Sequence, residues 1–121
     1  MLLTVMLPLC GCGSDAPELY EVSGRVTLNG RGLTAGSISF HPAVGNSFQS
    51  DSPSSQLQLD GSFRMKTYPW GFGVPEGDYE VTLSPELAQR IGRPEYADRA
   101  KSPLRIMVPA KAVTEYEFRL D

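Results

Sequence analysis

Histidine, cysteine and net positive charge are scarce in this sequence, and each shortage excludes a class of function. The 121 residues contain one histidine, His41, and two cysteines, Cys10 and Cys12. Catalysis by several histidines is therefore excluded, as is a four-ligand zinc site within one chain. The 11 Lys and Arg residues stand against 14 Asp and Glu residues, which gives a formal net charge of −3. We expect no nucleic-acid partner, because such partners require a basic surface.

Turn-forming residues are abundant by contrast. The sequence has 12 glycines and 10 prolines, a composition that disfavours a helical bundle. Hydrophobic residues make up 40% of the chain and charged residues 21%. This balance supplies enough apolar material for a packed core and argues against disorder. A chain of this length is predicted to form one domain.

The first residues form a short apolar segment that predicts an export signal. Residues 1–9, MLLTVMLPL, carry no charge and are far shorter than the roughly 20 residues of a membrane-spanning helix. Their length suits the apolar part of a signal peptide, and Leu9, Gly11 and Cys12 resemble the end of a bacterial lipobox. The resemblance implies that residues 1–11 are removed and that the Cys12 thiol receives a diacylglycerol. No Lys or Arg precedes the apolar segment, which departs from the usual basic start of a signal peptide.

Other roles fit the two cysteines less well. A lipobox ending at Cys10 would place Pro8 and the bulky Leu9 before the cleaved bond. A disulfide between Cys10 and Cys12 would be strained, because only one residue separates them. With residues 1–11 removed, residues 12–18 form the acylated cysteine and a short polar tether, and the domain covers residues 19–121. Core packing alone must then stabilise the domain.

Alternation of apolar and polar residues dominates the sequence after the tether and predicts strands. In residues 22–28 the apolar positions share one parity and would face the core. The Asn29–Gly30 pair that follows predicts a tight hairpin, since both residues tolerate a positive φ. Residues 59–61 predict a second hairpin loop, with Gly61 in the left-handed conformation and Gln58 opposite Ser62. Further strands are predicted over residues 37–41, 62–66, 79–83, 104–108 and 115–120.

Two segments depart from this alternation. Residues 43–55 are polar and rich in serine, and they are predicted to form an exposed loop. Residues 84–91 predict a short helix, with Ser84 as the N-cap and Pro85 at the first helical position. Gly92 would end this helix.

Several short strands with half-polar faces are typical of an antiparallel β-sandwich. A parallel sheet buried on both faces would show continuous apolar runs instead. We therefore predict an all-β fold, an antiparallel Greek-key β-sandwich of the immunoglobulin-like kind, with one short helix between late strands.

Several segments occur in an order that is shared with a known family. They are VSGRVT (22–27) ahead of Asn29–Gly30, AGSISF (35–40), DGSF (60–63), VPEGDY (74–79), and PEYAD (94–98) followed by SPL (102–104). Together they resemble the carboxypeptidase regulatory-like domains of small bacterial lipoproteins, which have the transthyretin-like, or prealbumin-like, sandwich fold. The resemblance implies a cell-envelope setting and a non-catalytic accessory module.

No enzymatic constellation is predicted. Hydroxyisourate hydrolases share the transthyretin-like fold, but they use several histidines and a C-terminal Tyr-Arg-Gly-Ser, whereas this chain has only His41 and ends in FRLD. We interpret His41 as a solvated side chain at a strand end, because nothing in the sequence nominates a partner for a general base. Asp51, Asp60 and Asp78 stand beside turn residues, without the density of oxygen ligands that calcium requires. We expect no catalytic residue, metal or cofactor.

Three aromatic residues, Tyr68, Trp70 and Phe72, stand in a loop rich in proline and glycine. Exposed at one end of a sandwich, they could stack on sugar rings or contact a partner. Alternatively, Trp70 or Phe72 folds back and closes the open end of the core, which would stabilise so small a domain by about 2 kcal/mol. We predict the second arrangement.

The sequence as a whole predicts a bacterial envelope lipoprotein. Its lipid anchor at Cys12 would hold it to a membrane, with the domain on the extracytoplasmic side. The sandwich would be displayed for contact with an envelope protein or the cell wall. The alternative is a carbohydrate-binding module that uses the loop from Tyr68 to Phe72.

Overall fold

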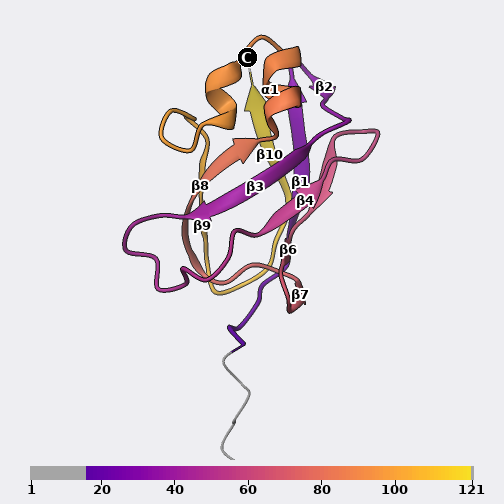
Figure 1. The fold of residues 1–121 in the computed structure, drawn as a ribbon. Coiled ribbons are helices and arrows are strands. Elements are labelled where there is room, and N and C mark those ends of the chain that lie inside the picture. The colour runs from indigo at the N-terminus through magenta and orange to yellow at the C-terminus, as the bar shows by residue number, and fades with distance from the viewer. Residues whose placement is uncertain (1–15, 121) are drawn as a thin grey trace, which may run out of the picture.

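The computed structural model describes residues 16–120, so the predicted leader and Cys12 lie outside the described residues. Strands follow the alternating segments closely (Figure 1). In chain order the elements are β1 (Val22–Leu28), β2 (Arg31–Gly32), β3 (Ser37–Pro42), β4 (Ser54–Gln56), β5 (Ser62–Arg64), β6 (Lys66–Thr67), β7 (Gly71–Phe72), β8 (Gly77–Leu83), α1 (Pro85–Arg90), the 3-10 helix η1 (Pro94–Ala97), β9 (Arg105–Val108) and β10 (Val113–Leu120).

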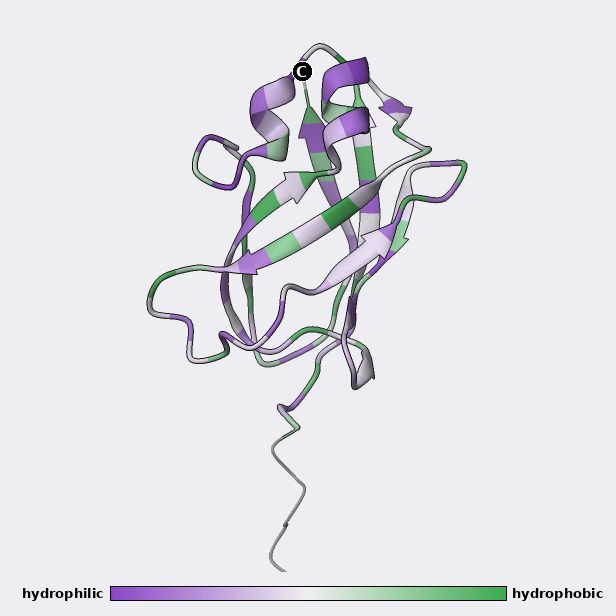
Figure 2. Cartoon of the chain, in the orientation of Figure 1, coloured by the Kyte–Doolittle hydropathy of each residue, from purple (hydrophilic) through white to green (hydrophobic). Residues whose placement is uncertain are grey.

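The elements form two stacked sheets, which confirms the predicted all-β sandwich. One sheet has the order β10–β1–β2, with β5 also paired to β1, and the other has the order β7–β6–β4–β3–β8–β9. Neighbours in the sheets are often distant in the chain, as β3 and β8 are. Hydropathy alternates along the central strands, so that each presents an apolar side to the space between the sheets (Figure 2).

The core lies between the two sheets and is built around aromatic rings. Phe40 of β3 packs against Phe118 of β10 across the sandwich, with ring centroids 6.2 Å apart in an edge-to-face arrangement. Phe118 also lies 5.9 Å from Phe63, and Phe40 lies 5.8 Å from Tyr79. The hydroxyl of Tyr79 donates a 2.7 Å hydrogen bond to the carbonyl of Pro75. Burial raises the pKa of Tyr79 to about 12, so the side chain stays neutral.

The predicted hairpin turns are confirmed. Asn29 and Gly30 both have a positive φ, of 52° and 85°, as a two-residue hairpin requires. Gly61 has a φ of 85°, and the amide of Gln58 donates to the carbonyl of Ser62 over 2.9 Å. The strands on either side of this second turn nevertheless enter different sheets, because β4 pairs with β3 while β5 pairs with β1.

One strand pair differs from the antiparallel prediction. β1 and β10 run parallel, in register from Gly24↔Tyr116 to Leu28↔Leu120. The register shifts between Val22 and Gly24, opposite Glu115, whose φ is 59°. The first and last strands are joined by the whole domain, so hairpin signals along the chain do not constrain their relative direction.

The segment predicted as an exposed loop, residues 43–55, is a loop up to Pro53, but its predicted exposure is wrong for three residues. Asn46, Phe48 and Pro53 are buried, and the segment ends in β4. Asn46 donates to the carbonyl of Asp78 over 2.8 Å and accepts from the amide of Phe48 over 2.9 Å. These two bonds fold the loop back so that Phe48 points inward.

The helix α1 begins at Pro85 as predicted, and it buries Leu87 and Ala88 against the end of the sandwich. Ser84 occupies the N-cap position without a side-chain bond to the helix. Its hydroxyl instead accepts the amide of Ser37 in β3 over 3.1 Å. The residue predicted as the cap therefore connects the helix to β3. The helices α1 and η1 together cover the end of the molecule farther from residue 16 (Figure 1).

Candidate functional site

The three predicted aromatic residues lie on a small hairpin at the end of the sandwich where the described chain begins (Figure 1). β6 and β7 pair antiparallel, with Lys66 opposite Phe72 and Thr67 opposite Gly71. The amide of Trp70 donates to the carbonyl of Thr67 over 2.8 Å, which closes the turn. The amide of Tyr68 donates to the carboxylate of Asp51 over 3.1 Å, so the hairpin is also tied to the preceding loop.

The prediction that Trp70 or Phe72 closes the core is wrong. Tyr68 is 80% exposed, Phe72 52% and Trp70 38%. Phe48, from the segment predicted as an open loop, is only 9% exposed. Its ring meets Trp70 edge-on, with centroids 6.2 Å apart. Phe48 is therefore the buried ring beside the hairpin, and the three predicted rings lie at the surface.

Two basic side chains lie beside Phe72. The guanidinium carbon of Arg64 stands 3.8 Å from the centroid of the Phe72 ring, and the Lys66 ammonium stands 5.7 Å from it. Both distances fall within the range of cation–π attraction. Arg64 also approaches the carboxylate of Glu21 at 3.7 Å. One face of Phe72 is thus covered by a guanidinium.

The chain enters the sandwich directly beside this hairpin. Tyr20 and Val74 exchange two backbone hydrogen bonds of 3.0 and 2.8 Å. A Cβ on Gly73 would lie 2.7 Å from the Cβ of Leu19, so only a glycine lets the two segments approach so closely. A shallow cavity of about 380 Å³ lies between the entering chain and the hairpin, and its lining includes Pro17, Glu18, Tyr20, Phe48, Trp70 and Glu76.

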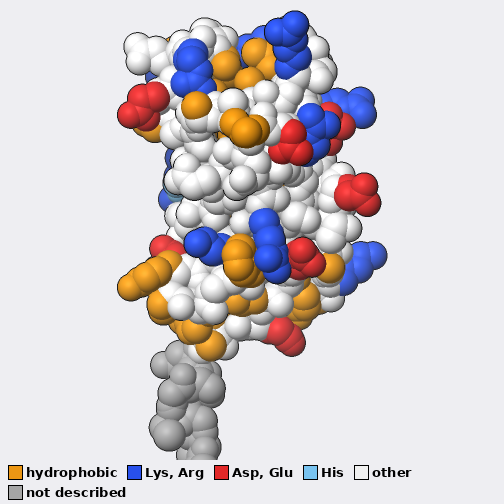
Figure 3. Space-filling view, turned by 90° about the vertical axis from the view of Figure 1, so that its right-hand side faces the viewer, with side chains coloured by type: hydrophobic (Ala, Val, Ile, Leu, Met, Phe, Trp, Pro, Cys, Tyr) orange, Lys and Arg blue, Asp and Glu red, His pale blue; other side chains and the backbone are white. Residues whose placement is uncertain are grey.

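We call the exposed surface formed by Arg64, Lys66, Tyr68, Trp70 and Phe72 the tether-end face. Figure 3 shows hydrophobic side chains gathered at this end of the molecule, with basic and acidic side chains among them. Sequence reasoning found the three rings but missed the two cations and Phe48. The alternation in residues 62–66 places Arg64 and Lys66 on the same outward side. That pattern could have identified the two cations as part of this surface.

His41 is placed by β3 on the outer side of its sheet, but it is half-buried, and the prediction of a solvated side chain is wrong. Its Nε2 lies 2.8 Å from the hydroxyl of Thr82, and its Nδ1 lies 3.2 Å from the hydroxyl of Ser52. Burial, aided by the positive charge of Arg99, lowers the pKa of His41. Ser52 occupies Nδ1, the ring nitrogen through which a carboxylate would orient a catalytic imidazole, so the geometry suits a structural polar cluster.

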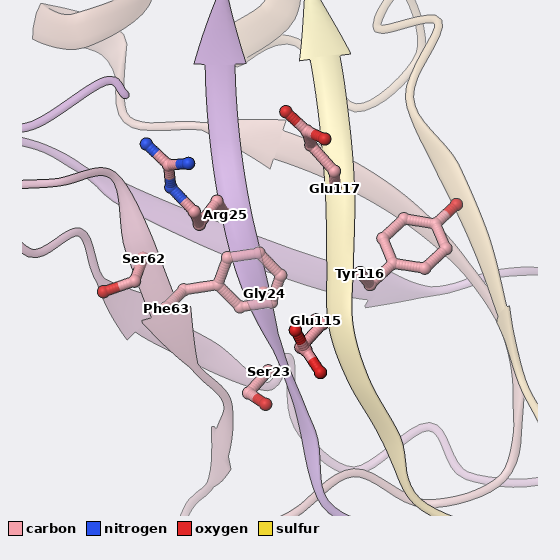
Figure 4. Close-up of a pocket in the computed structure, with 8 residues that line it drawn as sticks. All are labelled: Ser23, Gly24, Arg25, Ser62, Phe63, Glu115, Tyr116 and Glu117. Carbon is pink, nitrogen blue, oxygen red and sulfur yellow. The ribbon is translucent and has the colours of Figure 1, made fainter. Parts of the chain in front are cut away.

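A second concavity, of about 430 Å³, lies where β5, β1 and β10 run side by side (Figure 4). Its lining includes Ser23, Arg25, Ser62, Phe63, Glu115 and Glu117. Arg25 is committed to the carbonyl of Asp60 through two bonds, of 3.0 and 3.1 Å. Glu117 accepts from Thr27 over 3.0 Å, and that bond lowers its pKa. The central charged groups therefore already have partners within the fold.

The acidic turn residues behave as local structure. Asp60 accepts the amide of Ser62 over 3.0 Å, and hydrogen bonds from Ser62 lower its pKa. Across residues 16–120, no three His, Cys, Asp or Glu side chains come together in a way that could hold a metal ion. The same residues include no helix with the length and apolarity that crossing a bilayer demands.

Comparison with known proteins identifies a similar fold. No family model matches the sequence, and no curated protein matches it. The structure is similar to that of a DUF3823 family protein from Parabacteroides merdae ATCC 43184, with a TM-score of 0.51 and 21% sequence identity over 87% of this chain. The matched region is 46% of that protein's chain. The similarity supports the β-sandwich fold.

Proposed function

We propose that this chain is a lipid-anchored protein of the bacterial cell envelope that displays a non-catalytic β-sandwich for contact with an envelope protein or the cell wall. The observation that carries the proposal is the arrangement of leader and domain. A lipobox-like Leu9–Gly11–Cys12 is followed by a short polar stretch, and the chain then enters the sandwich at one end, at Tyr20. The ordered resemblance to carboxypeptidase regulatory-like lipoproteins supports the same function.

The attachment geometry explains how such a protein would work. A tether at one end leaves both sheets and the far end, covered by α1 and η1, open to partners. Two or more acyl chains give stable membrane attachment, whereas one gives only weak and reversible binding. A diacylglycerol on Cys12 would therefore hold the domain at the membrane permanently.

The anchor is tested by expressing the full chain in a bacterial host with radiolabelled palmitate. We expect the wild-type protein to carry the label and to sediment with membranes. Cys12→Ala should lose both the label and the sedimentation, because its thiol is the acceptor. Cys10→Ala is the matched control and should retain both, since residue 10 leaves with the leader. Equal membrane partitioning of Cys12→Ala and wild type would refute the anchor.

The proposed absence of catalysis is tested separately. A broad hydrolase screen of the purified full chain should detect no turnover, and metal analysis should find no stoichiometric metal. The polar cluster of His41, Ser52 and Thr82 is the natural place to look for an exception. An activity that disappears in His41→Gln but survives in a surface variant would overturn this part of the proposal.

A carbohydrate-binding module is the second candidate, and the exposure of Tyr68, Trp70 and Phe72 is the observation that favours it. Aromatic rings with a free face can stack on sugar rings. Trp70 is the single tryptophan of the sequence, so its emission reports on this surface alone. Titration with a soluble peptidoglycan digest should change that emission if the module binds glycans.

A further inference from the structure

The tether-end face combines exposed rings with the entry point of the chain. The bridge between Tyr20 and Val74 and the close approach of Leu19 to Gly73 hold the entering chain against the hairpin. The rings therefore cannot swing to the far side of the domain while the sandwich is folded. Whatever the chain is attached to near residue 16 lies on the same side as the rings.

The length of the tether limits how far this face can stand from a lipid anchor. Cys12 precedes Ala16 by four residues. A fully extended chain gains at most about 3.6 Å per residue, so the two positions can be no more than about 14 Å apart. A cysteine acylated at the membrane surface would thus keep Trp70 within a short distance of the lipid headgroups.

The side chains of this face suit a bilayer surface. Tyrosine and tryptophan are enriched at membrane interfaces, where an apolar ring meets a polar edge. The side chains of Lys66 and Arg64 flank Phe72 and can extend their charged ends toward water or phosphate.

Charge does not dominate this surface. Four carboxylates accompany the two cations at this end. Glu21 lies 3.7 Å from Arg64, and Asp51 accepts from the amide of Tyr68. Glu18 and Glu76 line the cavity beside Trp70. Rings rather than net charge would therefore drive contact with a bilayer, and the contact should depend little on the share of anionic lipid.

We propose that the tether-end face rests on the same bilayer that holds the lipid anchor, with Tyr68, Trp70 and Phe72 at headgroup level. The inference rests on the proposed lipidation of Cys12 and adds an orientation to it: the sandwich stands end-on, with α1 and η1 pointing away from the membrane. A short tether between two binding sites gives an effective concentration in the millimolar range. Even a face with weak intrinsic affinity for lipid would then be docked for much of the time.

Glycan stacking fits the same residues less well. Arg64 covers one face of Phe72, and the ring of Trp70 is in contact with Phe48. A stacking platform needs open and broad ring faces, whereas insertion between headgroups requires only that ring edges protrude. The geometry therefore favours lipid, and glycan binding becomes one outcome of the test.

Fluorescence of Trp70 tests the proposal in the lipidated full chain. The purified protein is reconstituted into phosphatidylcholine vesicles with or without brominated acyl chains, because the contact should not require anionic lipid. Flotation of the vesicles reports the anchor, and quenching of Trp70 reports docking. We expect flotation together with a shift of the emission to shorter wavelength and a loss of intensity in brominated vesicles.

Matched variants separate docking from folding. Tyr68→Ser combined with Phe72→Ser should lower the quenching of Trp70 while flotation is unchanged. Leu59→Ser is the control, because Leu59 is 91% exposed on the turn between β4 and β5, which lies away from the tether (Figure 1). It should leave quenching as in wild type. Circular dichroism of all three proteins verifies that the sandwich is intact.

The outcomes distinguish the two proposals. Flotation with quenching supports docking. Flotation without quenching overturns docking and leaves the anchor in place, whereas loss of flotation overturns both. An emission change of Trp70 on addition of a soluble peptidoglycan digest, with no quenching in brominated vesicles, would assign the rings to glycan and overturn docking.

Discussion

Replacing Gly24 by alanine should destabilise the pairing of the first strand, β1, with the last strand, β10. Gly24 lies in β1 opposite Tyr116 of β10, at the point where the register shifts. A Cβ built on Gly24 would lie 1.7 Å from the carbonyl oxygen of Tyr116 and 2.6 Å from the carbonyl carbon. Since these are backbone atoms, no side-chain rotation can relieve the clash.

The size of the effect follows from that distance. A carbon–oxygen contact settles at about 3.3 Å, so the strands must separate by roughly 1.6 Å at this point. Backbone shifts forced by overpacking cost about 1–3 kcal/mol, and two weakened ladder hydrogen bonds add about 1 kcal/mol each. The total of about 3–5 kcal/mol is a large share of the stability of an ordinary domain, about 5–15 kcal/mol.

Thermal unfolding followed by circular dichroism measures this loss. At about 4 °C or more per kcal/mol for a domain of this size, Gly24→Ala should lower the Tm by at least about 12 °C. Gly30→Ala is the control, because no atom lies within 4 Å of its Cβ and only its positive φ of 85° is strained. It should cost about 1 kcal/mol. A Tm for Gly24→Ala no lower than that of Gly30→Ala would refute the close approach of Gly24 to the carbonyl of Tyr116.

Two further predictions concern Phe48 and the half-buried His41. Phe48→Ala should lower the free energy of unfolding in urea by about 3 kcal/mol and move the Trp70 emission to longer wavelength, because the two rings are in contact; unchanged emission would contradict that contact. His41 should titrate below its usual pKa of 6.5 in an NMR experiment. The unfolded chain then binds the proton more readily, so stability is lost as the pH falls from 7 through the folded-state pKa, and His41→Gln should lack this component. A pKa above 6.5 would contradict the burial of the ring.

Period-two alternation was a sufficient signal for most of the sandwich. The strands β1, β8, β9 and β10 were predicted because their apolar residues must face the core, and the structure buries them there. The turn at Asn29–Gly30 was predicted because few other pairs tolerate a positive φ at both positions. These features depend on neighbours in the chain, which sequence reasoning can inspect directly.

Features that depend on distant neighbours were missed for the same reason. The parallel pairing of β1 with β10 joins residues about a hundred positions apart, and no local pattern specifies it. Residues 43–55 resemble an ordinary polar loop, but Asn46 turns the chain inward by bonding to the carbonyl of Asp78. Burial of Phe48 depends on that bond, so composition alone could not predict it.

The candidate site was also predicted only in part: its rings were identified, but their exposure was not. Tyr68, Trp70 and Phe72 were identified from composition, since three rings in a loop of prolines and glycines stand out. The burial of Trp70 or Phe72 was predicted wrongly, because the ring buried beside the hairpin, Phe48, comes from another segment of the chain.

The two ends of the sandwich differ in how far their apolar side chains are buried. At the far end α1 buries Leu87 and Ala88, so apolar residues there serve the fold. At the tether end Phe48 is buried, whereas the hairpin rings have 38–80% of their surface exposed. Replacing Tyr68 and Phe72 by serine should therefore lower the free energy of unfolding only slightly, because little buried apolar area is lost. A change in membrane contact produced by those variants can thus be attributed to the rings themselves.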